Sequence, residues 1–130
     1  MGMNVVVDSD NVGTLRAVVV EGKLVFKPET DPTHVRTFDA EYIFVHMGGK
    51  LEIGTEDHPY TSKLIITMHG DRKTLKIPTY GNKVIGIRHA SLDIHGAPIS
   101  KVKSLIRETA NVGATSIRLY DKITDWKVGD

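Results

Sequence analysis

The sequence of 130 residues contains no cysteine, and aromatic residues make up only 6% of it. Without cysteine the chain can form neither a disulfide scaffold nor a Cys-ligated metal site, although its compartment stays open. It also lacks an apolar run near the roughly 20 residues that cross a bilayer, and Met1–Asp8 has no basic start or long apolar stretch typical of a leader. We therefore expect no membrane contact by this fragment.

Charge of one sign is also missing, because 17 Lys and Arg face 16 Asp and Glu, for a formal net charge of +1. Nucleic-acid binding usually requires a clustered basic face, so the composition gives no reason to expect a nucleic-acid partner. No P-loop, dinucleotide fingerprint or nucleophile elbow occurs, and we expect no cofactor. The length suits a single domain with one core.

Short runs rich in branched and aromatic residues dominate what is present. Bounded by Gly, Asn, Asp and Pro, they are typical of strands. These runs cover residues 14–26, 41–53, 63–68, 83–94 and 115–120. The segments 27–36, 55–62 and 71–82 are rich in turn residues and are expected to be loops.

Evidence for helix is limited to Lys101–Glu108, preceded by Ser100 as a candidate N-cap. The same residues also alternate between apolar and polar, as strand residues do. One short helix is therefore left open in a chain that is otherwise predicted to be all-β.

A five-residue unit recurs at Gly22–Phe26, Gly49–Ile53 and Ala90–Ile94: a small residue, a polar one, Leu, any residue, then a large apolar one. Repeated strand–turn–strand units of this kind favour a stacked fold similar to a parallel β-helix, with the leucines piled in the core. The leucines are Leu24, Leu51 and Leu92. An antiparallel β-sandwich with Gly hairpin turns would produce the same local pattern and remains the alternative.

Several blocks between Asp8 and Gly96 resemble one known family in the same order. Its most recognisable segment is a strand, a glycine turn, a Leu-x-Ile-Gly strand, a Gly-Thr-Glu turn and a Pro-aromatic pair, as in Ala40–Tyr60 here. Later blocks are I-T-M-H-G-D, Y-G-N-K-V-I-G-I and L-D-I-H-G. In these features the chain is similar to the G-eight domain family, found in fibrocystins, fibrocystin-like proteins and cell-migration-inducing hyaluronidases.

The resemblance implies a β-rich module of a larger secreted or cell-surface protein, often placed before a parallel β-helix. On this basis we expect a domain over residues 1–110, followed by a strand and the start of the next segment at 111–130. The implied function is extracellular binding or scaffolding. Alternatives are a non-catalytic part of a hyaluronan-degrading enzyme and a structural cap of a β-helix, since fold alone does not settle function.

Glycines at turns and strand ends are expected to serve folding, because glycine tolerates positive φ and close backbone approach. The eight glycines of this kind are Gly22, Gly48, Gly49, Gly54, Gly70, Gly81, Gly86 and Gly96.

No catalytic or metal-binding residues are predicted within this chain. The six histidines show no His-x-x-x-His pair, which would place two ligands on one helical turn. Glycan hydrolysis usually requires two carboxylates, and Glu52, Glu56, Asp57, Asp71 and Asp93 are scattered. We therefore expect the isolated domain not to be an enzyme.

The segment 69–83 contains the strongest candidates for ligand binding. Cations pair with the carboxylates of an acidic glycan, and an aromatic ring can stack on a sugar face. The candidates are Arg72, Lys73, Lys76, Tyr80 and Lys83. Expected partners are an anionic glycan such as hyaluronan, or another protein, bound by a monomer. The competing interpretation is a polar loop that only covers a β-stack.

Overall fold

The computed structural model describes residues 2–74 and 76–127. It divides into two compact units, Met1–Ala97 and Pro98–Asp130, and every described strand lies in the first. The described residues form no helix. In particular, that part of the chain contains no helix long and apolar enough to cross a membrane.

Three parallel sheets build the first unit. Sheet A contains β1 (Asn4–Val7), β4 (Lys23–Phe26), β7 (Lys50–Ile53) and β10 (Ser91–Ile94) in that order. Sheet B contains β2 (Thr14–Leu15), β5 (Val35–Ala40) and β8 (Lys63–Met68). Sheet C contains β3 (Val18–Val20), β6 (Ile43–His46) and β9 (Ile85–Arg88).

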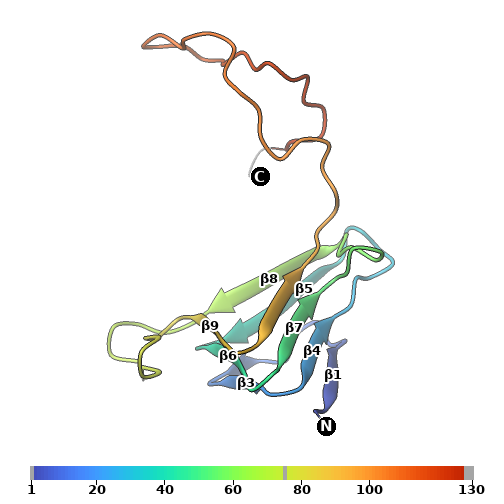
Figure 1. Cartoon of the computed structure of the whole chain (residues 1–130), viewed down its shortest axis with the longest axis vertical. Helices are drawn as coiled ribbons and strands as arrows, with labels where there is room; N and C mark the ends of the chain where they lie inside the picture. The colour runs from blue at the N-terminus through green and yellow to red at the C-terminus, as the bar shows by residue number, and fades with distance from the viewer. Residues whose placement is uncertain (1, 75, 128–130) are drawn as a thin grey trace. The chain divides into compact units, whose positions relative to one another are not determined.

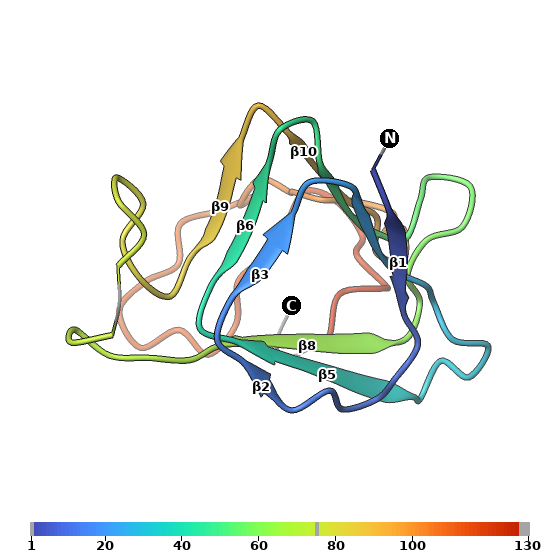
Figure 2. The ribbon, with the colours of Figure 1, turned by 90° about the horizontal axis from the view of Figure 1, so that it is seen from below.

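The chain visits the sheets in a fixed cycle, so that each coil contributes one strand to A, then B, then C. Figure 1 shows the strands of successive coils lying beside one another, and Figure 2, seen along the stack, shows the sheets as three sides of a triangle. The architecture is therefore all-β and similar to a parallel β-helix, as the repeat predicted. An antiparallel sandwich is ruled out by the parallel pairing.

The recurring unit forms successive rungs of sheet A. Leu24 pairs with Leu51 and Leu51 with Leu92, so the three leucines align as predicted. Leu24 and Leu51 are buried, but Leu92 is 40% exposed, and the expectation that it would be buried was wrong. The reason is its position: β10 is the outermost strand of sheet A, and no described strand covers it.

The core fills the triangle with side chains from all three sheets, because alternate residues of each strand face inward. Phe26 and Phe38 meet edge to face with ring centroids 5.0 Å apart. A glycine makes the close stacking of coils possible: a Cβ at Gly49 would lie 2.3 Å from the carbonyl oxygen of Val20. Any side chain there would push adjacent coils apart.

Strands β1 and β5 were not predicted, and β5 was missed for a physical reason. Its inward residues are Arg36, Phe38 and Ala40, so a charged residue interrupts the apolar alternation. Arg36 is fully buried at the corner between sheets A and B. Its guanidinium donates to the carbonyls of Val7 (3.1 Å) and Lys27 (3.2 Å), which belong to successive coils, and it also bonds the Glu29 carboxylate.

The second unit has little regular structure. Residues 101–108 are not helical, and residues 115–120, expected to form a strand, contribute one isolated bridge, Leu119 to Ile106. Val102 and Leu105 are exposed, so a helix here would lack the packed apolar face that stabilises short helices. The last three residues of the expected next segment, 128–130, lie outside the described residues.

Replacing Leu51 with Ala is expected to lower the free energy of unfolding by about 2–5 kcal/mol, because the side chain is fully buried between two paired leucines. Leu92→Ala is the matched control and should cost clearly less, since that side chain is partly solvated. Urea unfolding followed by circular dichroism measures both. Equal losses for the two variants would contradict the proposed stacking.

Candidate functional site

One corner of the triangle is enlarged in a single coil. Between sheets B and C the chain turns with two residues in each of the first two coils, Arg16–Ala17 and Glu41–Tyr42. In the third coil the same corner takes residues 69–84, here called the β8–β9 loop. This loop projects away from the triangle in both Figure 1 and Figure 2. Since two residues suffice to turn this corner, the additional length is not needed for the fold.

The β8–β9 loop is internally hydrogen-bonded. The Asp71 carboxylate accepts from the backbone amides of Lys73 (2.7 Å) and Thr74 (3.1 Å). Closer to β9, the Ile77 amide donates to the Gly81 carbonyl at 2.7 Å. The one carboxylate of the loop is therefore occupied by backbone donors.

The predicted ligand residues all lie on this loop. Arg72, Lys73, Lys76 and Lys83 are exposed, and none of the ion pairs found among the described residues includes them. Tyr80 differs, because it is half-buried, with its ring centroid 5.3 Å from that of Phe44 on β6. The four cations are thus exposed along one loop, whereas the tyrosine packs against sheet C.

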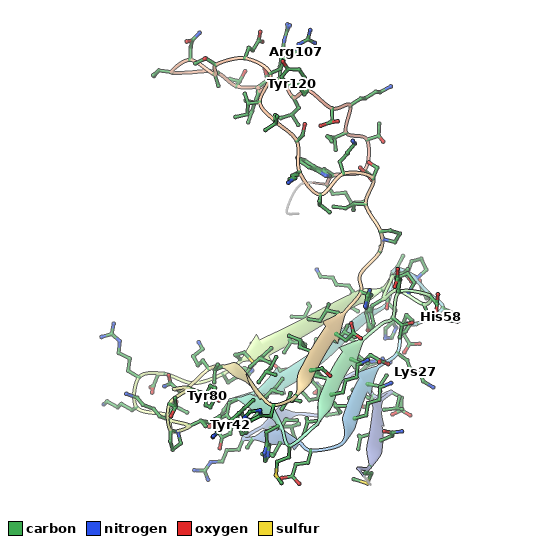
Figure 3. All side chains as sticks on the ribbon, in the orientation of Figure 1. Lys27, Tyr42, His58, Tyr80, Arg107 and Tyr120 are labelled. Carbon is green, nitrogen blue, oxygen red and sulfur yellow. The ribbon has the colours of Figure 1, made fainter. Side chains whose placement is uncertain are left out.

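The outer face of sheet C carries further aromatic and charged residues that were not predicted from the sequence. Phe44 stacks on His46 with centroids 4.9 Å apart. On β9, Gly86 pairs with Phe44 and Arg88 pairs with His46, so all four residues face outward together. Figure 3 shows Tyr80 and Tyr42 on the same side of the unit, with Lys27 and His58 on the opposite side. The alternation of Tyr42, Phe44 and His46 in the sequence was the available signal.

A separate row of charges lies on the outer face of sheet A. Lys23 Nζ and Lys50 Nζ each lie 2.8 Å from a Glu52 oxygen, and Lys50 also lies 2.8 Å from Asp93 Oδ2. Hydrogen bonds from Lys23 and then Lys50 hold the pKa of Glu52 below its usual range. Lys50 and then His95 lower the pKa of Asp93 in the same way. Both groups therefore remain carboxylates at neutral pH.

Four histidines lie within reach of a carboxylate. Three of these contacts join a histidine to a carboxylate of the preceding coil: His34 with Asp10 at 2.8 Å, His46 with Glu21 at 3.2 Å and His69 with Asp39 at 2.7 Å. The fourth is His95 with Asp93 at 2.8 Å. Within residues 2–74 and 76–127, no three metal-binding side chains converge.

The eight glycines expected to serve folding differ in what requires a glycine: close backbone approach at some positions, a positive φ at others. A Cβ at Gly22, as at Gly49, would collide with backbone of the preceding coil. Positive φ angles occur at Gly48, Gly54, Gly70 and Gly81, whereas Gly96 has open space around it. Gly86 lies in the middle of β9, and a Cβ there would meet a Phe44 ring carbon at 3.1 Å.

Comparison with known proteins gives a consistent set of matches. The family model described as the G8 domain matches residues 1–106. Mouse Fibrocystin-L is 41% identical over 91 residues, which are 70% of this chain and 2% of that protein. Human Fibrocystin-L is 34% identical over 89% of this chain and 3% of that protein, and dog Fibrocystin is 32% identical over 84% and 3%. The chain thus spans only a small part of these relatives, and no solved structure matches it.

Acid is expected to weaken the fold partly through Glu52. Its folded pKa lies below the ordinary value of 4.5, so its stabilising contribution is present above that value and is lost as the pH falls through the folded pKa. Urea midpoints measured from pH 7 to pH 3 should fall for the parent and fall less for Glu52→Gln. Parallel curves for the two proteins would show that the Glu52 ion pairs do not stabilise the folded state.

Proposed function

Because the chain belongs to the G8 domain family, we propose that it is a binding module of a larger extracellular or cell-surface protein, and that its β8–β9 loop binds an anionic glycan such as hyaluronan. The family membership supports only a module of a larger protein. The glycan is inferred from the chemistry of the loop. The chain's own location at the cell surface is part of the same proposal.

One observation supports this function best: four exposed cations on a loop that is longer than its corner requires. Buried or ion-paired cations would already be satisfied, but Arg72, Lys73, Lys76 and Lys83 have no carboxylate partner among the described ion pairs. Uronate carboxylates along a polysaccharide repeat at regular intervals and can meet several cations at once. Charge-assisted hydrogen bonds of this kind are the stronger ones.

The binding should be weak for a single domain. Exposed ion pairs each contribute only about 0–1 kcal/mol, and the loop offers four cations. Salt will screen them, since the Debye length is about 8 Å at physiological ionic strength. A glycan with many repeats could still be held firmly if the parent protein presents further binding modules.

A second candidate is a scaffolding role, favoured by the open end of the stack. Strands β1, β2 and β3 are each paired on one side only within the described residues. Beside them lies a hollow of about 910 Å³, lined mostly by apolar residues such as Val5, Leu15 and Val18. A stack with such an end fits a structural cap or spacer in a longer protein, whether or not it binds a ligand.

A third possibility is a non-catalytic part of a hyaluronan-degrading enzyme. A glycosidase requires a general acid whose pKa is raised, together with a second carboxylate. Glu52 and Asp93 are adjacent on neighbouring strands, but each has a lowered pKa and is paired with lysine. Glu52 and Asp93 therefore do not supply the general acid with a raised pKa that a glycosidase requires, and within such an enzyme this pair would be non-catalytic.

Removing two cations from the loop should weaken glycan binding. Arg72→Ala with Lys73→Ala is expected to reduce the affinity for hyaluronan oligosaccharides at low salt, and added salt should weaken the parent in the same direction. Titration into labelled protein measures both. The matched control is Lys27→Ala with Lys63→Ala, which removes the same charge from exposed positions outside the loop. Equal binding by the loop variant and the parent, or no binding by either at low salt, would favour the scaffolding role.

The isolated domain is expected not to shorten hyaluronan, because its adjacent carboxylates Glu52 and Asp93 are both held ionised. The measurement is the size of hyaluronan on a gel after incubation across a range of pH. Depolymerisation that disappears when one carboxylate is replaced by its amide would overturn this expectation.

A further inference from the structure

Phe44 occupies an unusual place for a large apolar side chain. Residues that alternate with it along β6, Ile43 and Val45, are fully buried in the core. Phe44 therefore faces outward on sheet C and does not belong to the core cluster. Phe44 is only partly exposed, because Tyr80 and His46 pack against its ring.

A glycine on the adjacent strand sets the position of this ring. Gly86 pairs with Phe44 across sheet C and is buried although it faces outward. A Cβ at that position would lie 3.1 Å from Phe44 Cδ2 and 3.5 Å from Tyr80 Cδ1. Glycine in the middle of a strand weakens the strand and often marks a close approach. Because Gly86 has no side chain, the rings of Phe44 and Tyr80 can both pack close to the backbone of β9.

The charges around this aromatic pair are asymmetric. Arg88 lies two residues after Gly86 on the same face, is exposed, and forms no ion pair among the described ones. Lys83 is exposed just before β9. Next to Phe44 on β6, the Glu21 carboxylate lies 3.2 Å from His46 Nε2, so the acid nearest to the stacked rings faces a histidine.

We propose that Phe44 and Tyr80 form a platform for a pyranose ring of the acidic polysaccharide, with Arg88 pairing with the carboxylate of a neighbouring sugar. This inference rests on the proposed function and adds the reason why the site would prefer a carbohydrate to other polyanions. A sugar ring has a C–H face that packs on aromatic carbons, and binding sites combine such apolar surfaces with a few placed polar groups. The loop cations alone would accept any polyanion, whereas the platform selects a carbohydrate.

The test compares hyaluronan tetrasaccharide with polyglutamate, which has carboxylates but no sugar rings. Phe44→Ala should weaken the affinity for the tetrasaccharide about tenfold and leave polyglutamate binding unchanged. Arg72→Ala with Lys73→Ala should weaken both. If the loop variant loses tetrasaccharide binding and Phe44→Ala does not, the platform is overturned and the loop site is retained. If Phe44→Ala loses tetrasaccharide binding and the loop variant does not, the platform is retained and the loop site is overturned.

Gly86→Ala provides a second variant that keeps both rings. The added methyl must displace Phe44, so tetrasaccharide binding should fall several-fold. Gly96→Ala is the matched control, because a Cβ at Gly96 meets nothing within 4 Å, and it should bind like the parent. Thermal unfolding verifies that each variant is folded.

A neutral ligand separates the platform from electrostatics entirely. An N-acetylglucosamine tetramer has no charge, so it should shift the amide resonances of Phe44 and Gly86 in a salt-independent way, even if hyaluronan fails to bind. If neither sugar shifts these resonances, the platform is overturned. Shifts that persist in Phe44→Ala would also overturn it.

Discussion

Parallel, in-register pairing between successive coils is the constraint on which the first unit depends. In sheet A, β7 places Leu51 over Leu24 of β4, and β10 places Leu92 over Leu51. Because strand side chains alternate, a slip of one residue would bring Glu52 into the core and expose Leu51. The two lysines that hold Glu52 on the outside oppose the same slip. Core packing and surface charge therefore select one register.

Arg36 shows how the stack accommodates a charge inside its wall. The residue paired with it in the next coil is Leu64, so the position itself does not require a cation. Its guanidinium reaches carbonyls of two coils and the Glu29 carboxylate, which compensates for part of the cost of burial. One guanidinium nitrogen, Nε, has no hydrogen-bond partner among the described residues. The side chain that joins the coils at this corner therefore also destabilises the core, because it leaves one buried donor unsatisfied.

The strands whose residue pattern repeats from coil to coil could be predicted from the sequence. Strands whose pattern differs could not. Gly22–Phe26 and Gly49–Ile53 share one pattern because both form the same rung, so their pairing could be inferred. Strand β5 could not, because Arg36 is buried through contacts with residues distant in sequence. Tyr80 was selected as a stacking residue, but its partner Phe44 is 36 positions away, and only the three-dimensional register brings them together. Sequence spacing does not encode such contacts.

The unequal corners have a consequence for how related proteins can diverge. Where a coil turns from sheet B to sheet C, Arg16–Ala17 and residues 69–84 perform the same geometric task, so chain can be inserted at this corner without altering the rungs on either side. Lengthening of surface loops costs little free energy because closure entropy grows slowly with length. Each coil thus offers an independent place where surface chain can be added or deleted while the core of the stack stays the same.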